Sequence, residues 1–168
     1  MKSLTKLAIT VLILFTIFSN NVVCKAEDND SKEQIDEMIV SMCEEKNICP
    51  ELVQSIVFYE SSYKPNAKNN EHYGLMQINP KWHKSRMEKL GVEDLYNAEQ
   101  NLKVGIDYLN ELFLKYNDSV IVLNVYNSGK PIEKFTNYSR KILERSADLE
   151  SEREEVYEDG TTVTFTFG

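Results

Sequence analysis

The chain has 168 residues, which is enough for one domain with its own hydrophobic core. Its 19 lysines and arginines are outnumbered by 27 aspartates and glutamates, which gives a net charge of −8 at pH 7. Because contacts to phosphate groups need Lys and Arg, this balance argues against a nucleic-acid-binding protein. The same charge repels anionic lipids and polymers, so we expect any such ligand to be captured by short-range contacts.

Residues 1–26 have the pattern of a secretory signal peptide. Lys2 and Lys6 precede an apolar run over residues 7–18, and Ala26 offers the small residue that cleavage requires. The run is short for a membrane span, so we expect a cleaved signal and a mature protein outside the cytoplasm. An uncleaved membrane anchor is the alternative.

The first two helices are predicted on either side of a short turn. Ser31 and Gln34 have the spacing of a capping box, which predicts that the first helix begins after Ser31. Pro50 suits the first turn of the second helix. Apolar residues recur at helical spacing along the first helix and mark its buried face: Ile35, Met38, Ile39, Met42 and Cys43.

Cys43 and Cys49 are the two cysteines that remain if Cys24 is removed with the signal. In an oxidising compartment a pair so close in sequence is expected to form a disulfide, which adds roughly 2 kcal/mol for so small a loop. Two buried thiols are the alternative. No metal site is expected, because His72 and His83 lie far from the cysteines in the sequence and without ligand spacing.

Glu60 lies at the end of an apolar helix stripe. It follows Ile56 by one turn, on the face formed by Leu52, Val53, Ile56 and Val57. Partial burial and the negative end of the helix dipole both raise the pKa of a carboxyl group in that position. A carboxylic acid that stays protonated near neutral pH is suited to general acid catalysis of glycosidic cleavage. A solvated surface glutamate is the alternative.

The segment 62–73 is rich in Asn, Lys and Pro and predicts a loop or a small hairpin. A short helix is predicted from Asn79 to about Leu90, with Gly91 as its C-terminal signal. Trp82 within this helix is interpreted as a core aromatic, with a sugar-binding platform as the alternative.

The longest amphipathic helix is predicted over residues 97–116. Gly105 lies on its apolar face, where glycine costs about 1 kcal/mol against alanine unless close helix packing requires it. Asp118 predicts the N-cap of a further helix that ends near Gly129, and a last helix is predicted from about Thr136.

Beyond Ala147 the composition changes. We therefore divide the chain into the signal peptide, one domain over residues 27–147, and an acidic extension over residues 148–168. The charged run at 150–155 is interpreted as a solvated helix end. The segment 156–167 alternates apolar and polar residues around an Asp-Gly pair, which predicts a β-hairpin.

Four short motifs follow one another along the central part of the chain, and a fifth match closes it. They are Glu60-Ser61, Gly74-Leu75-Met76-Gln77, Asn101-Leu102 with Gly105 and Tyr108-Leu109, Tyr126-Asn127-Ser128-Gly129, and the segment from Tyr138 to Leu143. In this order they resemble the lytic transglycosylases of the soluble-transglycosylase (SLT) type, within the lysozyme-like superfamily. The resemblance covers about residues 35–145 and implies a mainly α, lysozyme-like α+β domain with a small loop or hairpin beside the catalytic helix.

The resemblance implies a bacterial enzyme that acts on peptidoglycan glycan strands outside the cytoplasm. Glu60 would act alone, first as the acid and then as the base, in cleaving the β-1,4 bond between N-acetylmuramic acid and N-acetylglucosamine. The muramoyl 6-hydroxyl would attack C1 and form a 1,6-anhydro end. No metal or cofactor is implied, and we expect a monomer.

The motif matches also imply a role for each remaining site residue. Gln77 would donate hydrogen bonds to the sugar, and Met76 would form an apolar wall that keeps Glu60 protonated. Tyr138 would place its hydroxyl near Glu60. The other three would line the cleft: Tyr126, Asn127, which could also hold the backbone of the turn after Glu60, and Asn69, which stands where the family often has serine.

Two other functions remain open. A lysozyme-like muramidase would need a second carboxylate; animal-type lysozymes have theirs where this sequence has His72, and the adjacent Glu71 would point elsewhere in a strand. The other alternative is a wall-binding or assembly factor with little turnover, serving a secretion or conjugation machine.

Overall fold

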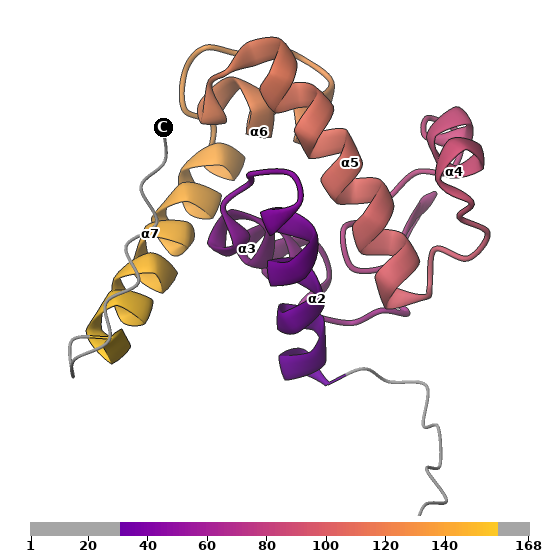
Figure 1. The fold of residues 1–168 in the computed structure, drawn as a ribbon. Helices are drawn as coiled ribbons and strands as arrows, with labels where there is room; N and C mark the ends of the chain where they lie inside the picture. Colours follow the sequence, from indigo (N-terminus) through magenta and orange to yellow (C-terminus); the bar gives the residue numbers. More distant parts are fainter. Residues whose placement is uncertain (1–30, 158–168) are drawn as a thin grey trace, which may run out of the picture.

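The structure, a computed structural model, describes residues 31–157. The predicted signal peptide lies outside this range. No helix within the described residues combines the length and the apolar character that a membrane crossing requires. The described part is mainly α-helical with one small antiparallel hairpin, as predicted (Figure 1).

Helices α2 (Lys32–Glu44) and α3 (Pro50–Ser61) begin where the sequence predicts. The Ser31 hydroxyl accepts from the Gln34 amide, and the Gln34 side chain accepts from the Ser31 amide, so the capping box is formed. Pro50 occupies the first turn of α3. The apolar stripe of α3 is buried, which fixes the rotation of the helix about its axis and therefore the direction of Glu60 at its end.

The predicted loop or hairpin after α3 is a two-stranded ladder. Strands β1 (Lys68–Asn69) and β2 (His72–Tyr73) pair antiparallel, with Lys68 opposite Tyr73 and Asn69 opposite His72. Tyr73 also pairs with Ile78, and this second pairing folds the intervening Gly74–Gln77 loop back on itself.

Helix α4 (Lys84–Leu90) begins later than predicted. The chain forms turns before Lys84, because the Asn79 carboxamide accepts from the Lys81 amide and the Asn79 carbonyl accepts from the amides of residues 82 and 83. Gly91 ends the helix in the left-handed region, at φ 65°, as predicted.

Helix α5 (Ala98–Tyr116) crosses the centre of the molecule over nearly the predicted residues (Figure 1). The Asn97 side chain caps it by accepting from the Gln100 amide. A Cβ at Gly105 would overlap the side chain of Met76, so close packing does require glycine there. The close neighbour is the Gly74–Gln77 loop rather than a second helix. Ion pairs from Arg86 to Asp107 and Glu111 tie α4 to the outer side of α5.

Helices α6 (Ser119–Ser128) and α7 (Asn137–Tyr157) complete the described fold. Asp118 caps α6 as predicted, and Gly129 ends it at φ 69°. Helix α7 packs along α3 and continues past Ala147, so the charged run at 150–155 is a helix end as predicted (Figure 1). Residues 156 and 157 of the predicted β-hairpin are helical, and the rest of that segment lies outside the described residues.

The hydrophobic core draws on α2, α3, α5, α6 and α7. Its largest fully buried helical side chains are Ile35, Ile39, Val53, Ile56, Leu102, Ile106, Leu109, Leu123 and Ile142.

The predicted disulfide is wrong for this structure, since Cys43 and Cys49 are both free thiols. Cys43 is fully buried in the core, whereas the sulfur of Cys49 lies 3.1 Å from a Glu51 oxygen and 3.0 Å from a Glu150 oxygen on α7. Cys49 is the N-cap of α3, a position that directs its side chain toward α7 instead of back toward α2. Burial raises the pKa of each thiol to about 12.

Candidate active site

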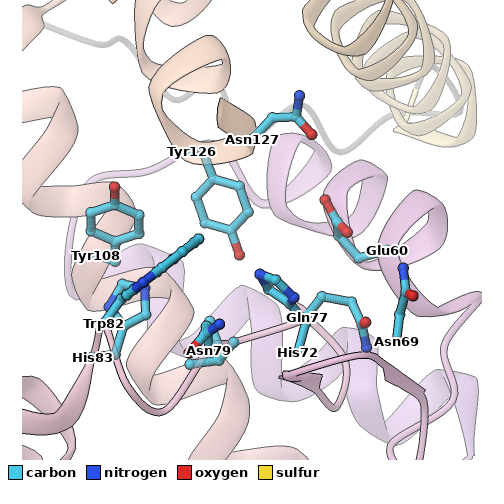
Figure 2. A pocket seen from close by; sticks show the side chains of 11 residues that line it. Glu60, Asn69, His72, Gln77, Asn79, Trp82, His83, Tyr108, Tyr126 and Asn127 are labelled. Atoms are coloured by element: carbon cyan, nitrogen blue, oxygen red, sulfur yellow. The ribbon is translucent and has the colours of Figure 1, made fainter. Parts of the chain in front are cut away.

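A cleft of about 220 Å³ opens beside the C-terminal end of α3 (Figure 2). Its walls come from α3, the hairpin, the segment before α4, and helices α5 and α6. The lining residues are Glu60, Asn69, His72, Gln77, Ile78, Asn79, Trp82, His83, Tyr108, Tyr126 and Asn127.

Glu60 lies in the last turn of α3, just before the left-handed residue Ser62 that ends the helix. The Tyr138 hydroxyl of α7 donates a 2.7 Å hydrogen bond to Glu60 Oε1, so Tyr138 lies where the sequence predicts. Burial raises the pKa of the Glu60 carboxyl above its usual value. The Tyr138 hydrogen bond and the nearby Lys141 and His72 act against this shift. The pKa is therefore raised, as predicted, and burial is the main cause.

The Gly74–Gln77 loop is held from below by Asn101, a fully buried residue of α5. The Asn101 amide donates to the carbonyls of Tyr73 and Leu95, each at 2.8 Å, and its oxygen accepts from the Met76 amide at 2.8 Å. Gly74 has φ +74°, and a Cβ there would overlap the Asn101 side chain. Asn101 therefore fixes the loop that carries Gln77 into the cleft.

Gln77 lies at the same end of the cleft as Asn69 and Glu60 (Figure 2). Its backbone is left-handed, at φ 49°, an uncommon conformation for a residue other than glycine and one often found at functional sites. Its side-chain amide nitrogen donates to the Gly74 carbonyl at 2.9 Å and to the Ala67 carbonyl at 3.4 Å, which uses both of its hydrogens. This leaves the side-chain oxygen as the group that can meet a sugar, so Gln77 is arranged to accept a hydrogen bond rather than to donate as predicted.

Met76 is not among the residues that line the cleft. Its side chain is fully buried against Gly105, and its carbonyl accepts from the Tyr126 hydroxyl at 2.7 Å. The predicted apolar wall beside Glu60 is therefore not formed by Met76, because the close approach to Gly105 draws its side chain into the core.

The two α6 residues of the predicted site both line the cleft. Tyr126 presents its ring and is fixed by its hydrogen bond to the Met76 carbonyl. Asn127 is exposed, and within the part of the chain that the structure describes it makes no hydrogen bond to the turn after Glu60.

Trp82 overturns its interpretation as a core aromatic. It is 72% exposed and lines the cleft, with its ring edge-on to His72 at 5.6 Å between ring centroids. The prediction placed Trp82 inside a helix that starts at Asn79, whereas the chain still forms turns there and α4 begins only at Lys84. Its polar neighbours Lys81 and His83 were the available signal of exposure.

Sequence reasoning also missed the aromatic end of the cleft, opposite Glu60. The rings of His83 and Tyr108 lie there with their centroids 4.7 Å apart, and the centroid of the Tyr108 ring is 5.7 Å from that of the Tyr126 ring (Figure 2). Burial and the Arg86 guanidinium lower the pKa of His83 to about 4, so this imidazole is neutral at pH 7. The cleft thus has an acid at one end and aromatic rings at the other.

Among the described residues that line the cleft, Glu60 is the only one with a carboxyl group. Glu71 is exposed in the turn between β1 and β2 and is not a lining residue. A single buried acid with a raised pKa can donate a proton to a leaving oxygen and take one back later.

Comparisons with known proteins agree with this geometry. The family model for the transglycosylase SLT domain matches residues 37–148. The membrane-bound lytic murein transglycosylase E of Buchnera aphidicola is 25% identical over 128 residues, which cover 66% of this chain and 58% of that protein. The X-ray structure of an inactive Glu-to-Gln mutant of the lytic transglycosylase Slt from Pseudomonas aeruginosa matches with a TM-score of 0.62 and 17% identity, over 70% of this chain and 24% of that one.

The match to Slt shows that the fold is the predicted lysozyme-like one. The chain spans just over half the length of the curated relative and about a quarter of the solved one. The family match covers most of the chain and every residue of the cleft. This chain therefore belongs to the transglycosylase SLT domain family.

Proposed function

We propose that this chain is a peptidoglycan lytic transglycosylase with Glu60 as its single acid and base. The observation that carries the proposal is the position of Glu60: a largely buried carboxyl group with a raised pKa, in a cleft whose described lining offers no second carboxylate. A hydrolase of the usual kind needs two carboxylates on opposite sides of the scissile bond.

In the first step Glu60 gives its proton to the oxygen that links N-acetylmuramic acid to N-acetylglucosamine, and the bond from that oxygen to C1 breaks. In the second step the Glu60 carboxylate takes the proton of the muramoyl 6-hydroxyl, whose oxygen bonds to C1. The products are a 1,6-anhydro end and a free 4-hydroxyl, and Glu60 is protonated again. The Tyr138 hydroxyl stabilises the carboxylate between the two steps.

The remaining lining residues would bind the glycan strand. The Gln77 oxygen and the Asn69 carboxamide face the end of the cleft where the scissile bond would lie (Figure 2). The exposed indole of Trp82 offers an aromatic face for a sugar ring farther along the strand. Sugar–aromatic contact at one end and proton transfer at the other suit an extended polysaccharide.

We place this activity outside the cytoplasm of a bacterium, where peptidoglycan lies. The charged and apolar pattern of residues 1–26 supports this location, as does the printed name of the Buchnera relative, a membrane-bound lytic murein transglycosylase. A small SLT domain of this kind could serve a secretion or conjugation machine of the cell envelope, which is the partner we propose beyond the glycan itself.

The test is digestion of purified peptidoglycan with the protein from residue 27 onward and with its Glu60→Gln variant. We expect the variant to release no muropeptides while its circular dichroism spectrum and melting temperature remain those of a folded protein. Glu71→Gln is the matched control, since it removes a nearby exposed carboxyl group, and it should cleave like the parent. Equal release by parent and Glu60→Gln would contradict the catalytic assignment of Glu60, whereas no release by the parent would favour a wall-binding role.

A further inference from the structure

Two cations of α7 lie over aromatic rings of α3. The Lys141 ammonium is 4.3 Å from the centroid of the Tyr59 ring, and the Arg145 guanidinium is 3.9 Å from that of Phe58. Both rings are partly exposed, at 39% and 38%. We call these four residues, Phe58, Tyr59, Lys141 and Arg145, the basic strip.

The cations of the strip have unused hydrogen-bonding capacity. Ion pairs in residues 31–153 engage Lys32, Lys84, Arg86 and Arg153, but neither Lys141 nor Arg145. Arg145 Nε is buried and has no hydrogen-bond partner among these residues. Lys141 is near enough to the Glu60 carboxyl to lower its pKa, but neither cation forms an ion pair with a carboxylate of the described residues. In a chain of net charge −8, two such adjacent cations point to an anion supplied by a ligand.

The strip starts at the catalytic residue and leads away from it. Tyr138, Lys141 and Arg145 have the i, i+3, i+7 spacing of one helix face, and Tyr138 donates to Glu60. The Lys141 ammonium is also 5.4 Å from the Tyr138 ring. Seven residues of helix rise about 10 Å, which is about the length of three residues of extended peptide.

We propose that the basic strip binds the peptide stem that is joined to the muramoyl sugar, with Lys141 and Arg145 pairing with its carboxylates. This inference rests on the proposed function, because it places the muramoyl sugar at Glu60. The stem leaves that sugar through its lactyl group, so it begins beside the strip, and the rings of Tyr59 and Phe58 offer apolar surface to its small side chains. A separate anionic polymer is not joined to the sugar at Glu60, so nothing would place its charged groups beside the strip.

The strip would make the protein select stem-bearing glycan in spite of its overall negative charge. Arg145 is the residue whose substitution distinguishes recognition of the stem from recognition of the sugar itself. Removing the stem with an amidase leaves a lactyl carboxylate, which lies near Lys141, whereas Arg145 is one helical turn farther along α7.

The experiment measures binding of soluble muramoyl-containing oligosaccharides, with and without stems, by calorimetry to the chain carrying Glu60→Gln. We expect the stem-bearing oligosaccharide to bind about tenfold more tightly, and adding Arg145→Gln to reduce this preference to about twofold. Lys115→Gln is the matched control, because Lys115 lies 5.0 Å from the Tyr116 ring on α5 and is remote from Glu60 in the sequence. It should keep the tenfold preference.

Several results would overturn the inference. These are equal affinity for the two oligosaccharides, no binding of the stem-bearing one, or a preference that Arg145→Gln leaves intact. A poly(glycerol phosphate) that binds more tightly than the stem-bearing oligosaccharide and depends on Arg145 would assign the strip to an anionic wall polymer instead. If the unsubstituted protein cleaves glycan but shows no preference for stems, only this inference is contradicted. If it prefers stems through Arg145 but cleaves nothing, only the proposed function is contradicted.

Discussion

Two opposing effects act on the carboxyl group of Glu60. Burial disfavours its charged form, whereas the Tyr138 hydroxyl and the nearby Lys141 favour it. Burial prevails, so the pKa is raised and the acid is more often protonated near neutral pH than an exposed glutamate. The opposing groups keep the carboxylate accessible as a base, which one residue in two roles requires.

Replacing Tyr138 with phenylalanine should shift the pH dependence of catalysis. The hydrogen bond from Tyr138 lowers the pKa of Glu60, so Tyr138→Phe raises that pKa further. Activity that depends on protonated Glu60 falls as the pH rises through its pKa, so the alkaline limb of kcat/KM moves to higher pH. Tyr63→Phe is the control, because the Tyr63 hydroxyl donates to a carboxylate in the same way, but to Asp36 rather than to Glu60. An unchanged limb in Tyr138→Phe would contradict this account of the Glu60 environment.

Trp82 should contribute to glycan binding and little to stability. Its side chain is 72% exposed, so Trp82→Ala should change the free energy of unfolding by less than about 0.5 kcal/mol. Losing its contact with a sugar should raise KM about tenfold, equivalent to about 1.4 kcal/mol. Leu114→Ala removes an apolar side chain that is 82% exposed and serves as the control for both measurements. A variant that melts early with unchanged KM would return Trp82 to a structural role.

At the scale of elements, α5 supports the active-site loop. Asn101 satisfies two carbonyls and one amide around the Gly74–Gln77 loop, and Gly105 admits Met76 beneath it. The sequence motif that contains Asn101 and Gly105 is therefore explained by packing against the loop, not by contact with substrate.

Asn101→Ala should destabilise the protein by about 3 kcal/mol, because three buried backbone groups lose their partner. Urea denaturation measures this loss, and peptidoglycan cleavage should fall as well because the loop positions Gln77. Asn110→Ala, a half-buried asparagine of the same helix, should cost less than about 0.5 kcal/mol. A small effect at Asn101 would mean that the loop holds its shape without α5.

At the scale of the molecule, the site exists only in the folded chain. Tyr138 and Glu60 are 78 residues apart, and Tyr126 and Met76 are 50 apart, so two packed interfaces must form before the cleft is complete. The two thiols report on the same global structure, since Cys43 lies in the core and the half-buried Cys49 lies between α3 and α7.

Both thiols should react with Ellman's reagent only as the protein unfolds. A pKa of about 12 leaves very little thiolate at pH 8, and Cys43 is inaccessible. A protein that starts at residue 27 should therefore show slow reaction in buffer and two reactive thiols per chain in urea. An absence of reactive thiols in urea would support the predicted disulfide between Cys43 and Cys49. Rapid reaction of both thiols in buffer would contradict the packing described around them.

The sequence was sufficient where local chemistry decides the outcome. Ser31, Pro50, Asn97 and Asp118 mark helix starts that the structure confirms, and the apolar stripe of α3 was enough to direct Glu60. It was insufficient where distant segments meet. His83 and Tyr108 reach the cleft only because α4 is held against α5, and Met76 leaves it because Gly105 lies opposite. The thiol of Cys49 turns to α7, where its partner Glu150 is 101 residues away in the sequence.

The most direct test of the central claim is mass spectrometry of peptidoglycan digested in water labelled with heavy oxygen. Transglycosylation makes the muramoyl 6-hydroxyl the nucleophile, so we predict unlabelled muropeptides one water lighter than reducing ones, and none with Glu60→Gln. Reducing muropeptides that carry the heavy oxygen would contradict the account, because they would show that water attacks C1 and that a second group activates it.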